Sequence, residues 1–306
     1  MNAWIQLENV HLARGGRPVL QGLTASLAGR AVGLVGANGS GKSTLIGALL
    51  GVLRAHRGDI RVLGLALPQK AREVRARTGV MAEQAGIFPG GSGVDAVTFA
   101  GMISGLSYRE ALRRAHRALD ALEVGEERYR PTKGYSTGMR QRCKLAMSLV
   151  HHPEVLILDE PTVGLDPAGR TQLLSLIAEL RDEGRLVLLS THILQDAEAV
   201  CEELLLIEAG VVSYTGPVSR LVSPNAGQIT AEGPNLDGEL AAALGRAGLR
   251  VLDQHPGRIV FASQGDEDLR TFWRLVHERG LEVRGLGREV ITLEEAVVEL
   301  METSNG

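Results

Sequence analysis

The spacing of apolar residues changes several times along the chain, and each spacing predicts a different element. Residues 3–30 alternate between apolar and polar, which predicts short strands joined by glycine-containing turns. Three uninterrupted apolar runs, each bounded by polar residues, predict strands that are buried on both faces. These runs span residues 31–35, 155–158 and 186–189. Because helical spacing follows the first run and separates the other two, we expect βαβ units and a parallel sheet.

Residues 87–150 differ from their surroundings and are expected to form a mainly helical subdomain. Ser107 and Glu110 have the spacing of a capping box, in which the side chain of each residue accepts a hydrogen bond from the backbone N–H of the other. The helix that follows is predicted to have an apolar face made of Leu112, Ala115, Leu119 and Leu122. Its arginines are expected to form a solvated face, and a face toward a partner is the alternative.

The pattern restarts after residues 222–227, a stretch of Ser, Pro, Asn and Gly that is typical of a linker. We expect strands at 228–232, 249–254, 258–263 and 281–286, and helices at 236–247, 266–279 and 292–302. The chain is therefore expected to contain a large α/β domain (residues 1–222) and a small α+β domain (residues 228–306), both of ordinary domain size.

Composition narrows the class of protein. The chain has 306 residues, 44% of them hydrophobic, and a formal net charge of −3. It can therefore bury a substantial core, and no nucleic acid is expected as a partner. Cys143 and Cys201 lie far apart in apolar helical contexts, which favours reduced core thiols over a disulfide or a metal site. No apolar run has membrane-spanning length and the N-terminus lacks the apolar block of a signal peptide, so we expect a cytoplasmic chain.

The segment from Gly36 to Thr44 matches G-x-x-x-x-G-K-[ST], the pattern of a phosphate-binding P-loop. It lies between a predicted strand and a predicted helix, which is the setting this motif requires. The glycines let backbone N–H groups point inward, and the helix N-terminus adds positive charge. Lys42 supplies a cation for the outer phosphates, and Ser43 offers a hydroxyl to Mg²⁺. The nucleotide-binding residues expected here are Gly36, Asn38, Gly39, Ser40, Gly41, Lys42, Ser43 and Thr44.

Two acidic residues, Asp159 and Glu160, end the apolar run at 155–158. Ligands of open parallel sheets bind beyond the carboxyl ends of the strands, so we expect both acids beside the P-loop. Asp159 is placed to hold Mg²⁺, directly or through water. Glu160 is placed to orient or deprotonate the water that attacks the terminal phosphate. The alternative is a pair of surface acids capping a strand, which a four-residue apolar run directly before them disfavours.

Two further segments carry weaker signals. Ser136 is a good N-cap and Gly138 permits close backbone approach, which together predict a second helix N-terminus suited to phosphate. Taken alone, an ordinary helix cap explains them better. His192 follows the run at 186–189 and is placed to donate to a terminal phosphate, although a lone histidine more often has a structural role. His151 and His152 are expected on the surface, because no thiol or carboxylate at metal-ligand spacing accompanies them.

In their order and spacing, these segments resemble the ATP-binding subunit of ABC transporters over residues 4–222. By this resemblance Gly36 to Thr44 is the Walker A motif, Tyr135 to Met139 is the signature, Asp159 and Glu160 complete Walker B, Gly164 to Asp166 is the D-loop, and His192 is the switch histidine. The resemblance implies an α/β P-loop NTPase with an N-terminal antiparallel β subdomain and a helical signature subdomain. It also implies Mg²⁺-dependent ATP hydrolysis, with Lys42, Glu160 and His192 as catalytic residues.

The resemblance further implies that two such domains meet head to tail, with each ATP between one chain's P-loop and the other chain's signature. Ser136, Gly138 and Asp166 would then act on the nucleotide of a second chain, either a copy of this one or a paralogous ATPase. ATP closes this dimer and hydrolysis opens it, which drives a separate transmembrane permease. The expected location is the cytoplasmic face of the cell membrane, as a peripheral subunit.

The chain departs from the family pattern in three places. Thr137 and Met139 stand where the signature usually has glycine and glutamine, so ATP affinity or rate is expected to differ. Arg14 stands where an aromatic residue usually stacks on adenine, and a guanidinium plane can also stack. In the Q-loop, alignment from Gly79 places Glu83 at the glutamine position with Gln84 next to it, and we assign the magnesium-shell role to Gln84 on chemical grounds.

The last segment, residues 292–297, is similar to the terminal helix of ATP-binding subunits that pair with ABC-2 type permeases. This second resemblance implies export of a drug, a lipid or a polysaccharide, and an appendage that supports structure or dimerisation is the alternative for the segment. Two other functions are alternatives. A non-transport ATPase of the same fold, acting on a ribosome or on DNA, is disfavoured by the single nucleotide-binding domain and the mildly negative charge. A regulatory module that binds ATP without turnover is disfavoured by Glu160 and His192, whereas the altered signature is compatible with it.

Overall fold

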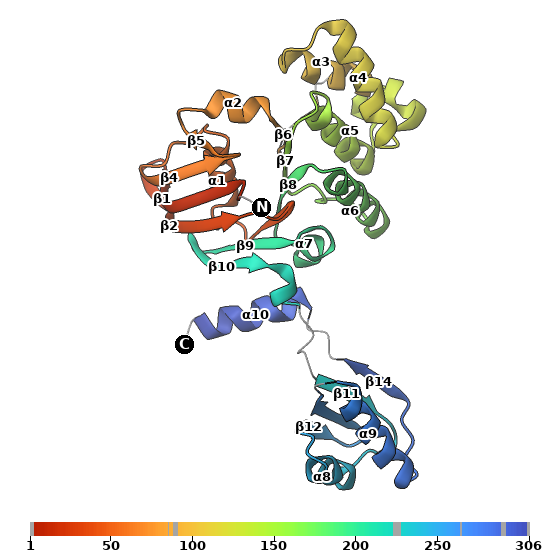
Figure 1. Cartoon of the computed structure of the whole chain (residues 1–306). Helices are drawn as coiled ribbons and strands as arrows, with labels where there is room; N and C mark the ends of the chain where they lie inside the picture. The colour runs from red at the N-terminus through yellow and green to blue at the C-terminus, as the bar shows by residue number, and fades with distance from the viewer. Residues whose placement is uncertain are drawn as a thin grey trace. The chain divides into compact units, whose positions relative to one another are not determined.

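The computed structural model describes residues 3–84, 86–87, 91–222, 228–263, 265–288 and 292–304. Internal contacts divide the chain into an N-terminal unit, Met1–Val218, and a C-terminal unit, Ser219–Gly306 (Figure 1). The division falls a few residues before the stretch predicted to be a linker, of which residues 223–227 lie outside the described residues. Within the described residues, no helix combines the length and the apolar character needed to cross a bilayer.

The N-terminal unit begins with an antiparallel sheet of order β2-β1-β4-β5. Its strands are β1 (Ile5–Arg14), β2 (Arg17–Leu27), β4 (Arg57–Val62) and β5 (Leu65–Leu67). The alternating segment predicted at residues 3–30 thus forms two long strands, whose pairing is interrupted by register shifts. These shifts are β-bulges or irregularities of the ladder, and such features bend a strand. The antiparallel β subdomain expected from the sequence is confirmed.

The second sheet has the order β10-β9-β3-β8-β7-β6. Its strands are β3 (Ala31–Val35), β6 (Thr78–Met81), β7 (Val155–Asp159), β8 (Leu186–Thr191), β9 (Glu203–Glu208) and β10 (Val211–Pro217). The edge strand β10 runs antiparallel to β9, and the other five strands run parallel to one another. The apolar runs predicted to be buried strands are β3, β7 and β8, and every residue of β3 and β7 is buried. Continuous apolar sequence is what a strand covered on both faces requires.

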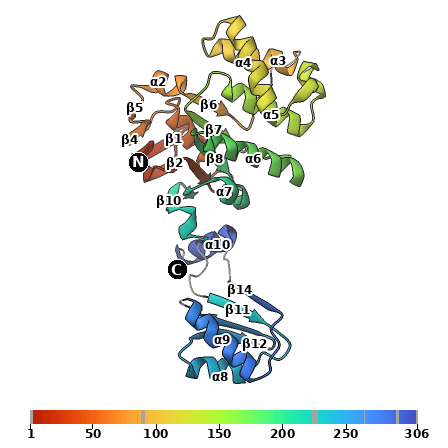
Figure 2. The same ribbon diagram turned by 45° about the vertical axis from the view of Figure 1, so that its right-hand side comes forward.

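Helix α1 (Lys42–Leu49) lies between the two sheets, and Leu45, Ile46 and Leu49 join residues of both sheets in one core. Three helices cover the opposite face of the parallel sheet (Figures 1 and 2). They are α5 (Thr137–Leu149), α6 (Pro167–Asp182) and α7 (Leu194–Val200). This three-layer arrangement confirms the α/β fold class. Helix α2 (Ala71–Ala76) leads from the first sheet into β6.

The expected helical subdomain consists of α3 (Gly93–Ile103), α4 (Tyr108–Ala121), two 3₁₀ turns (Gly125–Tyr129 and Thr132–Gly134) and α5. The predicted capping box at Ser107 is half formed. Ser107 accepts from the Glu110 backbone N–H, but the Glu110 carboxylate pairs with Arg113 and Arg114 instead of returning to the cap. Charge-assisted bonds to two guanidinium groups outcompete a neutral backbone donor. A complete box starts α3, between Ser92 and Asp95.

The C-terminal unit follows the order strand, helix, strand, strand, helix, strand. Its elements are β11 (Gln228–Glu232), α8 (Gly238–Arg246), β12 (Val251–His255), β13 (Arg258–Ala262), α9 (Asp266–Glu278), β14 (Gly285–Arg288) and α10 (Leu293–Ser304). The four strands form an antiparallel sheet of order β12-β13-β11-β14, which is the split βαβ, ferredoxin-like topology. Its core includes Phe272 stacked on Phe261, with ring centroids 4.9 Å apart.

Candidate active site

The carboxyl ends of β3, β8 and β7 meet at one edge of the parallel sheet, because these strands are neighbours in the order β3-β8-β7. Their registers are level: Val35 pairs with Thr191, and Asp159 pairs with Ser190. The P-loop, Glu160 and His192 each follow directly after one of these strands. A cavity of about 430 Å³ opens at this edge, and its lining includes Lys42, Ser43, Asp159 and Glu160. The sheet thus assembles residues that lie more than a hundred positions apart.

The P-loop wraps so tightly that two of its glycines have no room for a side chain. A Cβ on Gly36 would lie 2.3 Å from the Ile207 carbonyl oxygen. Gly41 has a φ of +111° and a Cβ there would lie 2.3 Å from Leu20 Cδ2. Between them, Ser40 Oγ is buried and makes no hydrogen bond within the described structure. A buried hydroxyl without a protein partner fits a site that receives a phosphate oxygen.

Lys42 is buried at the start of α1 and its ammonium is held from three sides. It donates to the Gly36 carbonyl oxygen at 2.6 Å and to that of Ala37 at 3.3 Å. Glu160 Oε1 lies 3.7 Å away, and both side chains are only 7% exposed. These contacts fix a positive charge beside the N–H groups of the loop. Such a preorganised cation strongly stabilises negative charge in a site from which water is excluded.

Asp159 carries two hydroxyl contacts. Ser190 Oγ donates to its Oδ1 at 2.7 Å, and Ser43 Oγ donates to its Oδ2 at 3.4 Å. Oxygen donors of this kind suit Mg²⁺, which proteins usually hold through one or two carboxylates together with substrate phosphates. In the described part of the chain, no group of three or more His, Cys, Asp or Glu residues forms a self-sufficient metal site. Ser43 and Asp159 therefore fit a magnesium ion that arrives with a nucleotide.

Glu160 and His192 form a hydrogen-bonded pair, with His192 Nδ1 2.9 Å from Glu160 Oε2. Glu160 has a φ of +51°, in the left-handed region that few non-glycine residues occupy. Its backbone N–H donates to the Ser190 carbonyl oxygen at 2.9 Å, which fixes this conformation. Strained backbone of this kind is concentrated at functional sites. The pair combines a buried carboxylate that lines the cavity with an imidazole that is 42% exposed.

Three other predicted residues differ in their relation to the cavity. Arg14, at the end of β1, lines it, as an adenine-contacting residue is required to do. Glu83 also lines it, whereas Gln84, our choice for the magnesium shell, is not among the lining residues. The Glu83 carbonyl oxygen accepts a hydrogen bond from Lys144 Nζ at 2.9 Å, which ties the Q-loop to α5.

Ser136, Gly138 and Asp166 are not among the residues that line this cavity. Ser136 is the N-cap of α5 and accepts from the Met139 backbone N–H at 3.3 Å. Asp166 is the N-cap of α6 and accepts from the Gly169 backbone N–H at 2.7 Å. The signature and the D-loop lie side by side, because a Cβ on Gly164 would be 3.3 Å from Thr137 Cγ2.

The two cysteines and the histidine pair lie outside the cavity. Cys143 and Cys201 are buried free thiols, as predicted, and burial raises the pKa of Cys143 to about 12. His152 is exposed, but the prediction of a surface position is wrong for His151, which is half-buried. Burial lowers the pKa of His151, so its imidazole stays neutral at neutral pH. The contact of this segment with β6, where a Cβ on Gly79 would lie 3.0 Å from Pro153 Cγ, was not visible in the spacing of the sequence.

Two residues of the site lay outside the sequence prediction. Ser190 bonds to Asp159, and Asp196, on α7, is fully buried and bonds to both Thr162 and Arg170. Ser190 ends an apolar run level with Asp159, so its place in the run was the available signal. Asp196 lies four residues after His192, but its partners are 26 and 34 residues away in sequence. No local pattern indicates such partners.

Comparison with known proteins agrees with the geometry of the site. The family model described as ABC transporter matches residues 21–163. A linearmycin resistance ATP-binding protein from Bacillus subtilis is 30% identical over 76% of this chain and 76% of its own length. A daunorubicin resistance ATP-binding protein from Streptomyces coeruleorubidus is 31% identical over 97% of this chain and 95% of its own length. A Nod factor export ATP-binding protein I from Paraburkholderia xenovorans is 31% identical over 94% of this chain and 98% of its own length.

Solved structures lead to the same family. An ATP-binding subunit of an ABC transporter has a TM-score of 0.63 and 27% identity, and the match covers 72% of this chain and 92% of that one. A component of the ABC transporter complex cbiONQ from Clostridium perfringens has a TM-score of 0.66 and 25% identity, covering 74% and 92%. The chain belongs to the ABC transporter family. It is an ATP-binding, ATP-hydrolysing subunit that powers a transporter, as the sequence predicted.

Proposed function

We propose that this chain powers export across the cell membrane, as one of two ATP-binding subunits joined to a separate permease. One observation carries the catalytic part: Lys42, Ser43, Asp159 and Glu160 line a single cavity, and His192 is hydrogen-bonded to Glu160. The relatives named for drug resistance and for Nod factor export support the direction of transport. The chemical class of the exported substrate is a drug, a lipid or a polysaccharide.

In this proposal each side chain has a defined task. Lys42 and the P-loop N–H groups bind the outer phosphates, and Ser40 donates its hydroxyl to a phosphate oxygen. Glu160 orients the attacking water and accepts its proton, and His192 holds the Glu160 carboxylate in place. Ser43 and Asp159 would hold Mg²⁺, which would supply positive charge to neutralise the phosphates. Glu83 and Gln84 are both kept as candidates for the edge of this metal shell, and Arg14 for contact with the base.

A second chain is part of the proposal because the signature and D-loop residues do not line the cavity of their own chain. Ser136, Gly138 and Asp166 do not line the P-loop cavity of their own chain, yet Thr137 and Gly164 place the signature and the D-loop together on one surface. A head-to-tail dimer would bring this surface to the P-loop of a partner, either an identical chain or a paralogue. Each ATP would then be held between two chains, so that binding closes the dimer and hydrolysis releases it.

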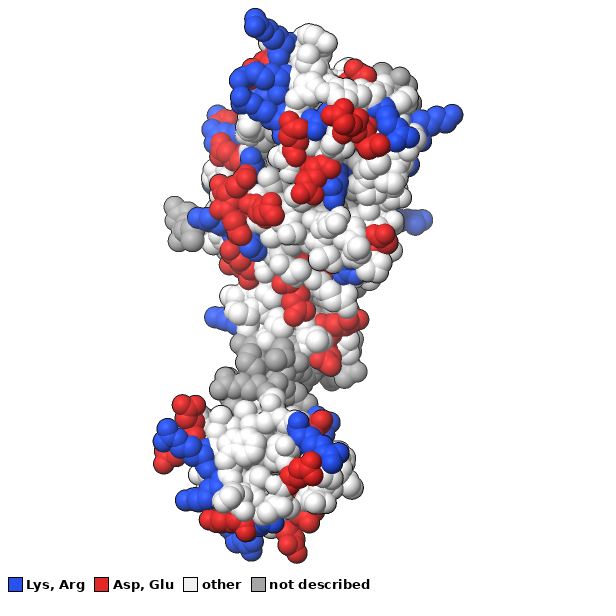
Figure 3. Space-filling view, turned by 90° about the vertical axis from the view of Figure 1, so that its right-hand side faces the viewer, with Lys and Arg blue, Asp and Glu red and all other residues white. Residues whose placement is uncertain are grey.

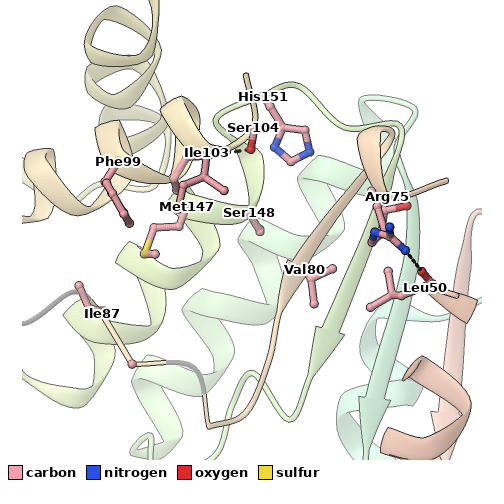
Figure 4. A pocket seen from close by; sticks show the side chains of 13 residues that line it. Leu50, Arg75, Val80, Ile87, Phe99, Ile103, Ser104, Met147, Ser148 and His151 are labelled. Carbon is pink, nitrogen blue, oxygen red and sulfur yellow. Dashed lines mark hydrogen bonds between the residues drawn. The ribbon is translucent and has the colours of Figure 1, made fainter. Parts of the chain in front are cut away.

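An apolar groove of about 590 Å³ is the proposed docking site for the permease (Figure 4). Phe99 and Ile103 on α3 project into it beside Met147 on α5, and Val80 and Leu50 lie across from them (Figure 4). Ile103 is 72% exposed and Phe99 44% exposed, which is unusual for large apolar side chains of a monomer. The occupant is a short cytoplasmic segment of the permease with an apolar face, which would keep the chain at the inner face of the membrane.

No nucleic-acid partner is proposed. On the face shown in Figure 3, basic and acidic side chains are interspersed and no continuous basic stripe runs across it. The formal net charge is −3. Electrostatic attraction to phosphates supplies most of the affinity of nucleic-acid-binding proteins, so the charge of this chain favours a transporter over an ATPase that acts on a ribosome or on DNA.

The catalytic assignment is tested by Glu160→Gln, which keeps the shape of the side chain and removes its basicity. We expect the variant to bind ATP, to form a dimer on ATP binding, and to hydrolyse ATP at least about a hundredfold more slowly. Glu183→Gln, at an exposed glutamate paired with Arg185, is the matched control and should keep the wild-type rate. A Glu160→Gln variant that turned over ATP at the wild-type rate would refute the role of Glu160.

The partner is tested by affinity capture of the tagged chain from detergent-solubilised membranes of the native cell. We expect a polytopic membrane protein in stoichiometric amount, and its loss when Ile103 is changed to Asp, because a charge in the apolar groove would be buried unpaired. Val211→Asp, which changes an exposed apolar residue outside the groove, should retain the partner. Capture of ribosomes or nucleic acid instead would favour the non-transport ATPase.

A further inference from the structure

We propose that Asp196 is a positioning residue for ATP hydrolysis. It fixes the position of the Glu160–His192 pair relative to α6, the helix that begins at the D-loop. This inference rests on the proposed function of that pair. In this proposal Asp196, Arg170 and Thr162 hold catalytic groups in position, whereas the P-loop residues bind the phosphates themselves. Asp196 itself is not among the residues that line the cavity.

The contacts of Asp196 join three separate segments. Its Oδ2 accepts from Thr162 Oγ1 at 2.5 Å, and its Oδ1 accepts from Arg170 Nε at 2.5 Å. Thr162 lies two residues after Glu160, in the loop that follows β7. Arg170 lies on α6, four residues after its N-cap Asp166, and Asp196 lies four residues after His192.

The burial of this carboxylate indicates that its position is fixed. Asp196 is 0% exposed, while the Arg170 side chain is 28% exposed. A buried charge is tolerated only when it is paired and hydrogen-bonded, and both of its oxygens are used here. Its partners cannot move independently without leaving a charge unsatisfied, so the three segments are constrained to shift together.

His192 depends on that constraint because little else orients it. Its side chain is 42% exposed, and among the described residues its ring has one hydrogen-bond partner, Glu160. The backbone on either side is fixed instead, since the Ile193 N–H donates to Thr191 Oγ1 at 3.0 Å and the Asp196 N–H donates to the Ile193 carbonyl oxygen at 3.1 Å. Asp196 thus anchors the turn that carries His192.

Through Arg170, Asp196 is also connected to the surface that would face the second chain in the proposed dimer. Asp166 caps α6 at one end of the link, and Arg170, one helical turn later, carries the link to Asp196. A contact that displaces the D-loop would therefore be transmitted to the loop of Glu160 and to the turn of His192. Hydrolysis in one cavity becomes sensitive to whether a partner chain is seated on the D-loop.

The test is Asp196→Asn, an isosteric change that removes the charge and replaces one acceptor with a donor. We expect kcat for ATP hydrolysis to fall about tenfold or more, since small misplacements of reacting groups have effects of this size, with the KM for ATP within about twofold of wild type. Asp182→Asn is the matched control: Asp182 accepts from Arg181 Nε at 2.8 Å but is 67% exposed. This control should leave kcat unchanged.

A double-mutant cycle separates positioning from a general loss of structure. In a His192→Ala background, measured in single turnover, Asp196→Asn should lower the rate by a smaller factor than in the wild-type background, because its route through the turn of His192 is already removed. An equal fall in both backgrounds would overturn the proposal. Thr162→Val, which deletes only a hydroxyl, replaces Asp196→Asn in the cycle if that variant does not fold.

A spectroscopic readout needs no turnover. The His192 ring resonance, identified by its loss in His192→Ala, should shift in Asp196→Asn and stay in place in Asp182→Asn. A fall in kcat with an unchanged His192 resonance would overturn the proposal. Failure of the underlying function is distinguishable, since it would appear as an absence of ATP hydrolysis by the wild-type chain or as a wild-type rate in Glu160→Gln.

Discussion

The two units of the chain bury different kinds of residue. The N-terminal unit buries five charged side chains among its described residues, namely Lys42, Arg128, Asp159, Glu160 and Asp196. In the described part of the C-terminal unit, Ser263 is the one buried polar residue and the rest of the core is apolar. Burying a charge is costly unless it is paired, and even a paired buried charge is weak evidence for stability. The site that Lys42, Asp159 and Glu160 form explains their burial better than stability does.

Sheet topology explains why Lys42, Asp159 and Glu160 lie together in the N-terminal unit, whereas Arg128 lies in a 3₁₀ turn of the helical subdomain. In the N-terminal unit parallel strands send their carboxyl ends to the same edge, so the residues after β3, β7 and β8 meet there. In the C-terminal unit every strand is antiparallel to its neighbours in the sheet. The carboxyl ends of neighbouring strands therefore lie at opposite edges. Loops there are divided between two edges, and no comparable cluster of chemical groups is formed by the described residues.

The largest expected effect comes from removing the buried cation. Lys42→Met keeps the length of the side chain but leaves Glu160 Oε1 without its ion-pair partner at 3.7 Å. We expect ATP hydrolysis to fall at least about a hundredfold, the size seen when one preorganised charge-stabilising group is removed, together with weaker ATP binding. Hydrolysis and binding of a fluorescent ATP analogue measure both.

Lys70 provides the matched control for Lys42, since its ammonium pairs with Glu73 and is 59% exposed. Lys70→Met should change the rate by less than about twofold, because exposed ion pairs contribute little. Substantial hydrolysis by Lys42→Met would mean that the chemistry does not depend on the buried charges of the N-terminal unit, and the contrast between the units would lose its functional meaning.

The second prediction damages the other unit. Phe272 is 0% exposed and stacks on Phe261, so Phe272→Ala should lower the free energy of unfolding of the C-terminal unit by about 3–5 kcal/mol. The neighbouring Trp273 is 46% exposed, and Trp273→Ala should have a much smaller effect. Calorimetry of the whole chain measures the unfolding, and ATP hydrolysis should stay within about twofold of wild type. Parallel loss of hydrolysis and of the C-terminal transition would show that the active site needs both units.

The sequence predicted best the features that depend on short stretches of chain. Continuous apolar runs were enough to place β3, β7 and β8, because a strand covered on both faces needs no polar positions. The P-loop was visible because the phosphate-binding turn is made by consecutive residues. Beyond residue 228, alternation and helical spacing placed the elements of the C-terminal unit, but β14 begins at Gly285, not at 281. Leu281 and Val283 contact the core from the preceding loop.

Features that depend on choices between partners could not be predicted. Glu110 has the spacing of a capping box, yet two arginines compete for it with a backbone N–H. Asp196 has no local signature, because its role comes from Thr162 and Arg170 on other segments. Which of Glu83 and Gln84 lines the cavity depends on the path of a single turn, and a pattern of residue types does not specify that path.

The smallest expected effect concerns Thr137, which stands where the family usually has glycine. Its Cγ2 would lie 3.3 Å from a Cβ on Gly164, so the methyl group is directed toward the D-loop of the same chain. We expect Thr137→Gly to change the KM for ATP by less than about threefold, or about 0.7 kcal/mol, because removing a group turned toward Gly164 clears little space for phosphates. Thr137→Ser, which removes only the methyl group, should match wild type. A tenfold or larger gain in Thr137→Gly would mean that the threonine crowds the nucleotide in the dimer, and the signature would then join the buried charges of the N-terminal unit as a determinant of its ATP affinity.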